Sequence, residues 1–559
     1  MSKVRFIFVV FLFLMFLISY CAKFEKFDIL IFDGKVIDGT GNPWVYTDVG
    51  IKGDKIVKVG KIFGANAKKM INAKGLYVVP GFIDMHCHSD YSLLVDGTAQ
   101  SKVRQGVTLE VIGESESAGP VLEKVVEKTK KDLEKLELKL TWKTLGDYFK
   151  VLEKSGISVN IASYVGLGQI RSCVMGLDET RSPNDKEMNE MKKLIKEAMK
   201  DGAVGLSSGL LYVPDMFFKT EEITELAKVA KEYGGIYATH IRSEDNEFLE
   251  SLDEAIRIGK GADIPVDIFH FKASAKKNWY KMPMAIEKIN EARKSGIDIT
   301  VNWYPYIAGS TSITIALPDW AREGGIERIL ERFKDPVTRE KIKSDMKTLD
   351  TGFDSMEEYM SNIYIADVPT EKNERFEGKS LTEVAKENHK DPIDNYFDLF
   401  LEEGGDISGV FFTMTEENKK LELKQPWLSI CSDGTAIKPE GLLGKGKPHP
   451  RYYGTFPRLL GRYVRQENVI TLEDAIRKMT SLAAQRLRLQ DRGLIKKGMF
   501  ADICIFDYDK MIDRATFENP HQYSEGVVYL LVNGKLVIEN GEHTGVKPGK
   551  VIFGPGKGK

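Results

Sequence analysis

The sequence predicts an α/β fold, a TIM (β/α)8 barrel that carries a small β domain built from both ends of the chain. Two observations predict the barrel: eight short apolar runs recur along the middle of the chain, and most are separated by amphipathic helical stretches. A third observation predicts the β domain, because runs of alternating apolar and polar residues with turn signals occur near both ends.

The first 25 residues are interpreted as a leader and excluded from the fold. Two basic residues precede an apolar run at 6–18, which is too short for a comfortable membrane span. Cys21 ends the stretch ISYC, which loosely resembles a bacterial lipoprotein box, although Tyr20 is bulkier than the usual residue. A cleaved signal peptide, a lipoprotein leader and an uncleaved anchor all remain open. We expect export to the periplasm or cell envelope rather than a cytoplasmic location, with any membrane attachment through Cys21 or the hydrophobic segment.

After the leader, residues 26–77 alternate apolar and polar positions, with DG, GN and KGD turn signals between short runs. Residues 489–559 have the same pattern. Because chain termini often lie close together, we expect these two segments to form one β domain.

Between them, residues 78–488 supply the predicted barrel. Apolar runs suited to burial on both faces favour a parallel sheet, and eight βα units favour a TIM barrel. Two long interruptions are needed: a charged helical stretch after the second strand, and a helical insertion at about 318–426 that we interpret as a lid or accessory subdomain. The eight runs are YVVPGFIDMH, VTLEVIGE, SVNIASYVG, AVGLSSGL, GIYATHIR, PVDIFHF, DITVNWYPY and WLSICSDG.

The charge and the cysteine content of the sequence limit the binding partners and the disulfide bonds that we expect. A formal net charge of −2 gives no electrostatic reason to expect nucleic acid. Cysteines beyond the leader are widely spread, and Cys87, Cys431 and Cys504 lie in strand-like runs, where we expect buried free thiols.

Histidines and carboxylates gather where barrel chemistry occurs, at the carboxyl ends of the strands. His86 and His88 are two residues apart, so their side chains share one face of the first strand and can reach one cation. Together with the groups at other strand ends they predict a metal site; these groups are His240 (strand five), His270 (strand six) and Asp433 (strand eight).

This pattern resembles the amidohydrolase superfamily and, within it, the N-acyl-D-amino-acid deacylases (D-aminoacylases). The resemblance covers nearly the whole chain after the leader. It rests on PGFIDMHCHSD, GLSSGLLYVPDMF, THIRSE, HFKASAK, WYPYIAGST, LPDWAREGG, SDG and HPRYYGTFPRLLGRY. It implies that the terminal segments form a small composite β-sandwich.

One departure from the family affects the metal site. D-aminoacylases typically end strand two with GNCG, whose cysteine is a ligand, whereas this chain has GESESAG. Glu114 could supply a carboxylate instead; Ser115 would be a poor ligand, Glu116 is a second candidate, and both glutamates could simply face solvent. Strand four has no lysine, which counts against the hydantoinase and dihydroorotase branch.

Zn2+ is the default metal for a site of imidazoles and carboxylates, with manganese and cobalt as alternatives, and we expect one or two ions. We expect a tighter site from His240, His270 and the strand-two group, and a weaker one from His86, His88 and Asp433. Asp433 is the expected proton acceptor and donor of the catalysis. The expected ligands of the substrate carboxylate are Lys272, Arg451, Tyr212, Tyr304 and Ser310.

The resulting hypothesis is metal-dependent hydrolysis of the amide bond of N-acyl-D-amino acids. Two alternatives remain: another amidohydrolase that acts on a cyclic amide or a D-residue dipeptide, and a barrel that binds without turnover.

Overall fold

The computed structural model describes residues 25–64 and 66–559. The predicted leader lies outside them except for its last residue. Within the described ranges, no helix is long and apolar enough to cross a membrane.

A closed ring of eight parallel strands forms the centre of the molecule, and each predicted run supplies one. Backbone hydrogen bonds close the ring at two places: Met85 N donates to Ile430 O at 3.3 Å, and Val204 N donates to Ser163 O at 2.9 Å. The predicted barrel is confirmed. Its strands are β6 (Phe82–Asp84), β7 (Val107–Ile112), β8 (Asn160–Ser163), β10 (Gly205–Gly209), β11 (Ile236–His240), β12 (Val266–Ile268), β13 (Ile299–Trp303) and β17 (Leu428–Ile430).

Amphipathic helices cover the outside of the ring, and α7 (Asp185–Asp201) shows how the sequence sets their limits. Asn184 caps its first turn in a reciprocal capping box with Glu187, and Gly202 ends it in a left-handed conformation. Its buried side chains recur at helical spacing and face the barrel. The other covering helices include α4 (Glu123–Glu134), α5 (Leu145–Ser155), α6 (Leu167–Met175), α8 (Thr220–Glu232), α9 (Phe248–Ala262), α10 (Met282–Lys294), α17 (Glu416–Leu423), α19 (Leu472–Met479) and α20 (Ser481–Arg486).

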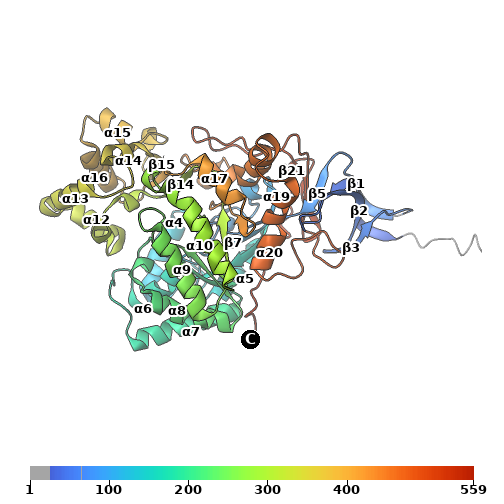
Figure 1. Ribbon diagram of the computed structural model, residues 1–559, viewed down its shortest axis with the longest axis horizontal. Coiled ribbons are helices and arrows are strands. Elements are labelled where there is room, and N and C mark those ends of the chain that lie inside the picture. Colours follow the sequence, from blue (N-terminus) through green and yellow to red (C-terminus); the bar gives the residue numbers. More distant parts are fainter. Residues whose placement is uncertain (1–24, 65) are drawn as a thin grey trace, which may run out of the picture.

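Strands from both ends of the chain hydrogen-bond into one nine-stranded sheet (Figure 1). The junction is antiparallel, with Val79 of β5 opposite Cys504 of β18. Ile31, Val49 and Ile503 belong to one buried cluster on this sheet. The strands are β1 (Lys26–Val36), β2 (Val45–Lys52), β3 (Lys55–Gly60), β4 (Asn66–Asn72), β5 (Tyr77–Pro80), β18 (Ile503–Phe506), β19 (Val527–Val532), β20 (Lys535–Glu539) and β21 (Glu542–His543).

The insertion lies at the opposite end of the molecule from this sheet (Figure 1). It has its own core, in which Phe333, Tyr396, Phe397 and Phe400 pack together. It is not purely helical, because β14 (Ala308–Ser312), β15 (Ile363–Asp367) and β16 (Ser408–Phe412) form an antiparallel sheet. Its helices are α11 (Asp319–Arg322), α12 (Gly325–Lys334), α13 (Pro336–Thr348), α14 (Met356–Ser361), α15 (Leu381–Glu387) and α16 (Pro392–Glu402).

The insertion of the structure therefore begins with β14, before residue 318, and ends with β16. The region after β16 contains α17, which packs against α10 and belongs to the barrel. Strands β14 and β16 are each only 5 residues long, and four residues of β14 are half-buried, so their sequences do not stand out from loops.

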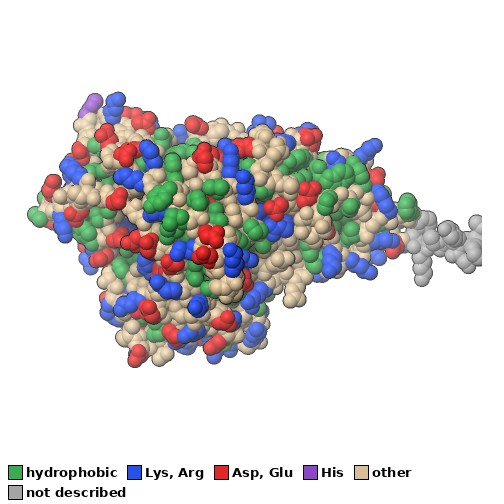
Figure 2. All heavy atoms as spheres, in the orientation of Figure 1, with side chains coloured by type: hydrophobic (Ala, Val, Ile, Leu, Met, Phe, Trp, Pro, Cys, Tyr) green, Lys and Arg blue, Asp and Glu red, His purple; other side chains and the backbone are tan. Residues whose placement is uncertain are grey.

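All four described cysteines, Cys87, Cys173, Cys431 and Cys504, are buried free thiols, as expected for the three in strand-like runs. Acidic and basic side chains are interspersed over the face of the molecule shown in Figure 2, without a large region of one sign.

Candidate active site

The carboxyl ends of the strands open into a cavity of about 860 Å³. Five of the predicted metal ligands line it: His88, Glu114, His240, His270 and Asp433. His86 lies beneath its floor and is 1% exposed. Residues more than 300 positions apart in the sequence are thus brought to one point, as the barrel topology requires.

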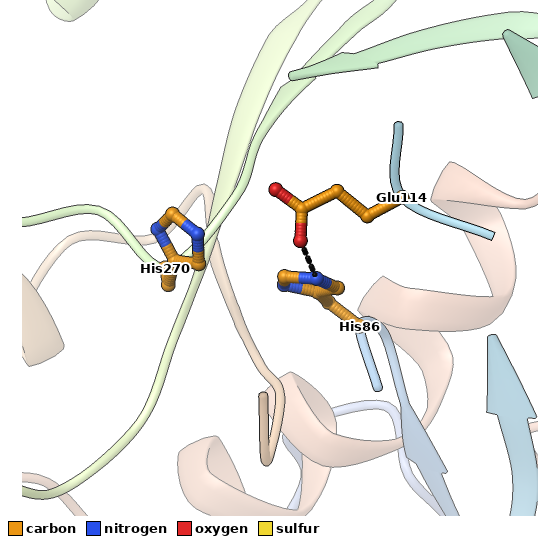
Figure 3. A group of neighbouring side chains, drawn as sticks. All are labelled: His86, Glu114 and His270. Atoms are coloured by element: carbon orange, nitrogen blue, oxygen red, sulfur yellow. Dashed lines mark hydrogen bonds and ion pairs between the residues drawn. The ribbon is translucent and has the colours of Figure 1, made fainter. Parts of the chain in front are cut away.

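Glu114 lies at the centre of the histidines. One of its carboxylate oxygens is 2.8 Å from His86 Nε2 and 3.5 Å from His88 Nε2, and the other is 3.5 Å from His240 Nδ1. Figure 3 shows the side chains of His86, Glu114 and His270 gathered at one point, with a dashed line that joins Glu114 to His86. Burial opposes ionisation of Glu114, but His86 and His240 outweigh burial and hold its pKa well below the usual range.

The two neighbouring candidates on strand two point elsewhere. Glu116 is about half exposed and pairs with Lys128 at 2.6 Å. Ser115 has a left-handed backbone (φ 51°), and it belongs to none of the clusters of candidate metal ligands among the described residues. Of the three, only Glu114 is in the cluster, at the position next to the family cysteine.

His86, His88 and Asp433 form a second group. His88 Nε2 is 3.0 Å from Asp433 Oδ1, and Arg451 Nη1 is 2.7 Å from Asp433 Oδ2. Burial opposes ionisation of Asp433, but Arg451, His270 and His88 together hold its pKa well below the usual range. Its backbone is left-handed (φ 48°), a conformation that costs free energy and often marks a functional residue.

A third group contains Glu244, which the sequence analysis missed. Its carboxylate lies 3.7 Å from His240 Nε2, 3.0 Å from His270 Nδ1 and 2.5 Å from Lys272 Nζ. Burial and the neighbouring Lys272 charge lower the pKa of His270 to about 4, so this imidazole is neutral near pH 7. The only available signal was an acidic residue four positions after the strand-five histidine.

These groups fit a metal ion. The ligand atoms lie within 4.8 Å of one another in three sets of residues: His86, Glu114 and His270; His86, His88 and Asp433; and His240, Glu244 and His270. His86 Nδ1, Glu114 Oε1 and His240 Nε2 are buried, and none has a hydrogen-bond partner in the described part of the chain. Buried polar atoms normally have partners, and imidazole and carboxylate donors suit zinc.

All five predicted carboxylate-binding residues line the same cavity: Lys272, Arg451, Tyr212, Tyr304 and Ser310. The Tyr212 ring is 5.0 Å from that of His240, and the Arg451 guanidinium is 4.8 Å from the ring of Tyr304. Among the described residues, Arg451 Nε and Tyr304 Oη are buried and have no hydrogen-bond partner. These two groups can therefore receive a ligand without breaking a bond within the protein.

His449 and Arg242 lie near the candidate site and make contacts with other parts of the protein. His449 is buried, accepts a hydrogen bond from Arg451 N at 3.0 Å and donates one to Ala308 O at 2.9 Å, so it fixes the start of the Arg451 segment. Arg242 pairs with Glu254 at 2.9 Å.

A fully buried network holds Asp433 from both sides. Lys102 Nζ donates to Asp84 Oδ2 at 2.8 Å, to Ser432 Oγ at 2.5 Å and to Gly434 O at 2.9 Å. Asp84 also accepts a hydrogen bond from Ser432 N at 2.7 Å. The residues before and after Asp433 are thus bound to the first strand and to α3 (Gln100–Val103).

A barrel with histidines and carboxylates at its strand ends defines a class of metal-dependent hydrolases, and comparison with known proteins agrees. The chain belongs to the amidohydrolase family, whose model matches residues 69–303 and 443–538. The unmatched interval contains the insertion.

The relatives extend over almost the whole chain. D-aminoacylase of Alcaligenes xylosoxydans xylosoxydans is 32% identical over 529 residues, which are 94% of this chain and 98% of that protein. The crystal structure of N-acyl-D-glutamate deacylase from Bordetella bronchiseptica contains zinc and a phosphonate mimic of the tetrahedral intermediate. It superposes with a TM-score of 0.80 at 28% identity and covers 95% of this chain and all of that one.

A D-aminoacylase structure with a binuclear metal centre, for which one-metal activation and second-metal attenuation are described, superposes with a TM-score of 0.78. It is 31% identical and covers 94% of this chain and all of that one. The predicted resemblance is confirmed.

Proposed function

We propose that this protein hydrolyses the amide bond of N-acyl-D-amino acids and releases a carboxylate and a D-amino acid. The observation that carries the proposal is the presence, in one cavity, of a histidine–carboxylate cluster and a buried guanidinium whose Nε has no hydrogen-bond partner among the described residues. The cluster suits hydrolysis, and the guanidinium suits the carboxylate of an amino acid. The activities of the relatives give the amide class and the D configuration.

Zinc is the proposed metal, as one or two ions. His240, His270 and Glu114 would hold the tighter ion, and His86, His88 and Asp433 a second one. When bound, zinc polarises an amide carbonyl and lowers the pKa of water toward ~7.

Asp433 is the proposed proton carrier. Its depressed pKa keeps the carboxylate ionised near neutral pH, so it accepts a proton from the attacking water. An amine leaving group is far more basic than a carboxylate, so the proton passes on to the amine. Arg451 holds one oxygen of Asp433 in place during both transfers.

Residues on another wall of the same cavity would bind the amino-acid half of the substrate. Arg451 Nε and Tyr304 Oη would take the substrate carboxylate, with Lys272, Ser310 and Tyr212 around it. A bidentate or charge-assisted contact of this kind fixes the scissile bond relative to the cluster.

We also propose that residues 1–25 direct export and that Cys21 is a site of lipid attachment. The basic start and short apolar run support this proposal. Expression of the full chain in a Gram-negative host, with fractionation and mass spectrometry of its amino terminus, tests it. A cytoplasmic product that starts at Met1 would refute it.

The activity is tested on leaderless protein loaded with zinc. Amine release is measured from N-acetyl-D- and N-acetyl-L-amino acids, with hydantoins and dipeptides beside them. Turnover of D-substrates but not of their L-enantiomers is expected. Turnover of hydantoins alone would replace the proposal with a cyclic amidase, and bound zinc without any turnover would refute it.

A further inference from the structure

A second cavity, of about 350 Å³, adjoins the first. His88, Glu114 and Glu116 line both. The first cavity extends from these residues across the ends of β10 to β13, where Arg451 and Lys272 lie. The second extends from the ends of β6 and β7 toward α4 and α6. Two of the candidate metal ligands, His88 and Glu114, therefore lie between the two cavities.

This arrangement assigns the two halves of an amide substrate. The scissile carbonyl must reach the cluster, and the carboxylate of the amino-acid half is held in the first cavity. The acyl half then points into the second. An acetyl group has only three heavy atoms, and a single water takes ~30 Å³ of liquid volume. A cavity of about 350 Å³ is much larger than an acetyl group needs.

The walls of the second cavity are polar as well as apolar. Ser172 is 2% exposed, and its hydroxyl has no hydrogen-bond partner in the part of the chain that is described. Buried hydroxyls usually have such a partner, so a bound group with hydrogen-bonding capacity would satisfy it. The apolar part of the wall consists of Val125, Leu136, Leu177 and Leu443.

Acidic side chains outnumber basic side chains among the described residues that line this cavity. Besides the cluster itself, it is lined by the carboxylates of Asp90, Glu116 and Asp132 and by a single lysine, Lys128. Lys128 pairs with Glu116 at 2.6 Å and with Asp132 at 3.7 Å. The Oδ1 atom of Asp90 is buried and has no hydrogen-bond partner among the described residues.

We propose, building on the function above, that the second cavity binds the acyl half of the substrate and prefers an acyl group that carries an ammonium. The substrate is then an aminoacyl amide of a D-amino acid, that is, a dipeptide with a D-residue at its carboxyl end. Water supplies the hydroxyl that stays on the acyl carbon as the C–N bond breaks, and the proton that leaves with the amine.

Isosteric substrates test this preference on the wild-type, zinc-loaded protein. N-β-alanyl and N-butyryl derivatives of one D-amino acid have the same size and differ in an ammonium against a methyl group; an N-succinyl derivative carries the opposite charge. We expect kcat/KM to be at least tenfold higher for β-alanyl than for butyryl, and lowest for succinyl. Equal values, or a preference for butyryl or succinyl, would overturn the inference.

The N-acetyl derivative separates this inference from the proposed function. If it is hydrolysed while β-alanyl and butyryl react equally, only the charge preference fails. If none of these D-substrates is hydrolysed, the proposed function fails and the inference with it.

Variants locate the preference in the cavity. Asp90→Asn and Asp132→Asn should each lower the β-alanyl to butyryl ratio of kcat/KM at least fivefold, whereas Glu127→Gln should not. Glu127 is the matched control, because it lies on the same helix as Asp132 and is 78% exposed outside the cavity. Because both substrates are measured on the same sample, the ratio does not depend on the fraction of folded protein. The zinc content of each variant shows whether the metal cluster is intact. Ratios equal to that of the control would contradict the assignment.

Discussion

At the scale of single residues, Glu114 connects the candidate ligands, since it lies within 3.5 Å of three histidine rings. Glu114→Gln should therefore lower zinc content and reduce kcat/KM by at least ~100-fold, as expected when a ligand charge is lost. Glu116→Gln is the matched control, because Glu116 pairs with Lys128 outside the cluster. Metal analysis after gel filtration gives the comparison; equal zinc in both variants would exclude Glu114 as a ligand.

The prediction for Asp433 differs, because this residue is proposed to transfer a proton as well as to bind the metal. Asp433→Asn keeps the shape but cannot accept a proton, so kcat should fall ~10²- to 10⁴-fold. Steady-state kinetics with zinc quantified in the same sample measures this effect. If the tighter ion is held by the other residues, at least one zinc per chain remains. Activity within tenfold of wild type would assign proton transfer to another group.

Prediction from sequence was most successful for residues at strand ends. Six ligand candidates lie at the ends of apolar runs, so barrel topology alone brings them together: His86, His88, Glu114, His240, His270 and Asp433. Glu244 escaped because it lies in the loop after β11, in a stretch of charged residues that has the composition of an exposed loop. Only the fold shows that its carboxylate is buried against His270 and Lys272.

At the scale of elements, α3 and the loop after β17 are joined through Lys102. Its ammonium is fully buried and donates hydrogen bonds to Asp84, Ser432 and Gly434. The positions of these residues fix the left-handed backbone of Asp433. No periodicity in the sequence indicates this contact, because it joins residues about 330 positions apart. A lysine in a short helix ordinarily faces solvent.

Lys102→Met should destabilise the protein by about 3–5 kcal/mol, because it leaves the Asp84 carboxylate buried without its cation. Equilibrium unfolding in urea measures the difference. Lys130→Met, which removes an exposed lysine of α4, is the control and should change stability by less than ~0.5 kcal/mol. A Lys102 variant as stable as the control would show that the network contributes little.

At the scale of the whole molecule, metal binding at the cluster should stabilise the folded barrel. Ligands that bind only the folded state stabilise it by RT ln(1 + [L]/Kd), which is about 4 kcal/mol at a thousandfold excess over Kd. Removing zinc with a chelator should therefore lower the melting temperature, and adding zinc should restore it. Calorimetry of wild-type and Glu114→Gln protein tests this; a chelator shift of equal size in both would place the stabilising ion elsewhere.

The insertion and the β domain were predictable to different degrees. The alternating strands at both chain ends predicted one β domain, and the structure joins them through β5 and β18. The limits of the insertion were harder to predict from the sequence. Its strands β14 and β16 pair across about one hundred residues, and each strand is stabilised by the other. Short, partly exposed strands of this kind carry little local signal.

The pairing of β5 with β18 also has a consequence for biosynthesis. A ribosome makes β5 before the barrel and β18 after it, so the edge of β5 has no partner while the intervening chain is translated. Unpaired strand edges are templates for aggregation. A nascent chain, or one truncated anywhere before residue 503, exposes this edge, and complete closure of the sheet can only follow synthesis of the last strands.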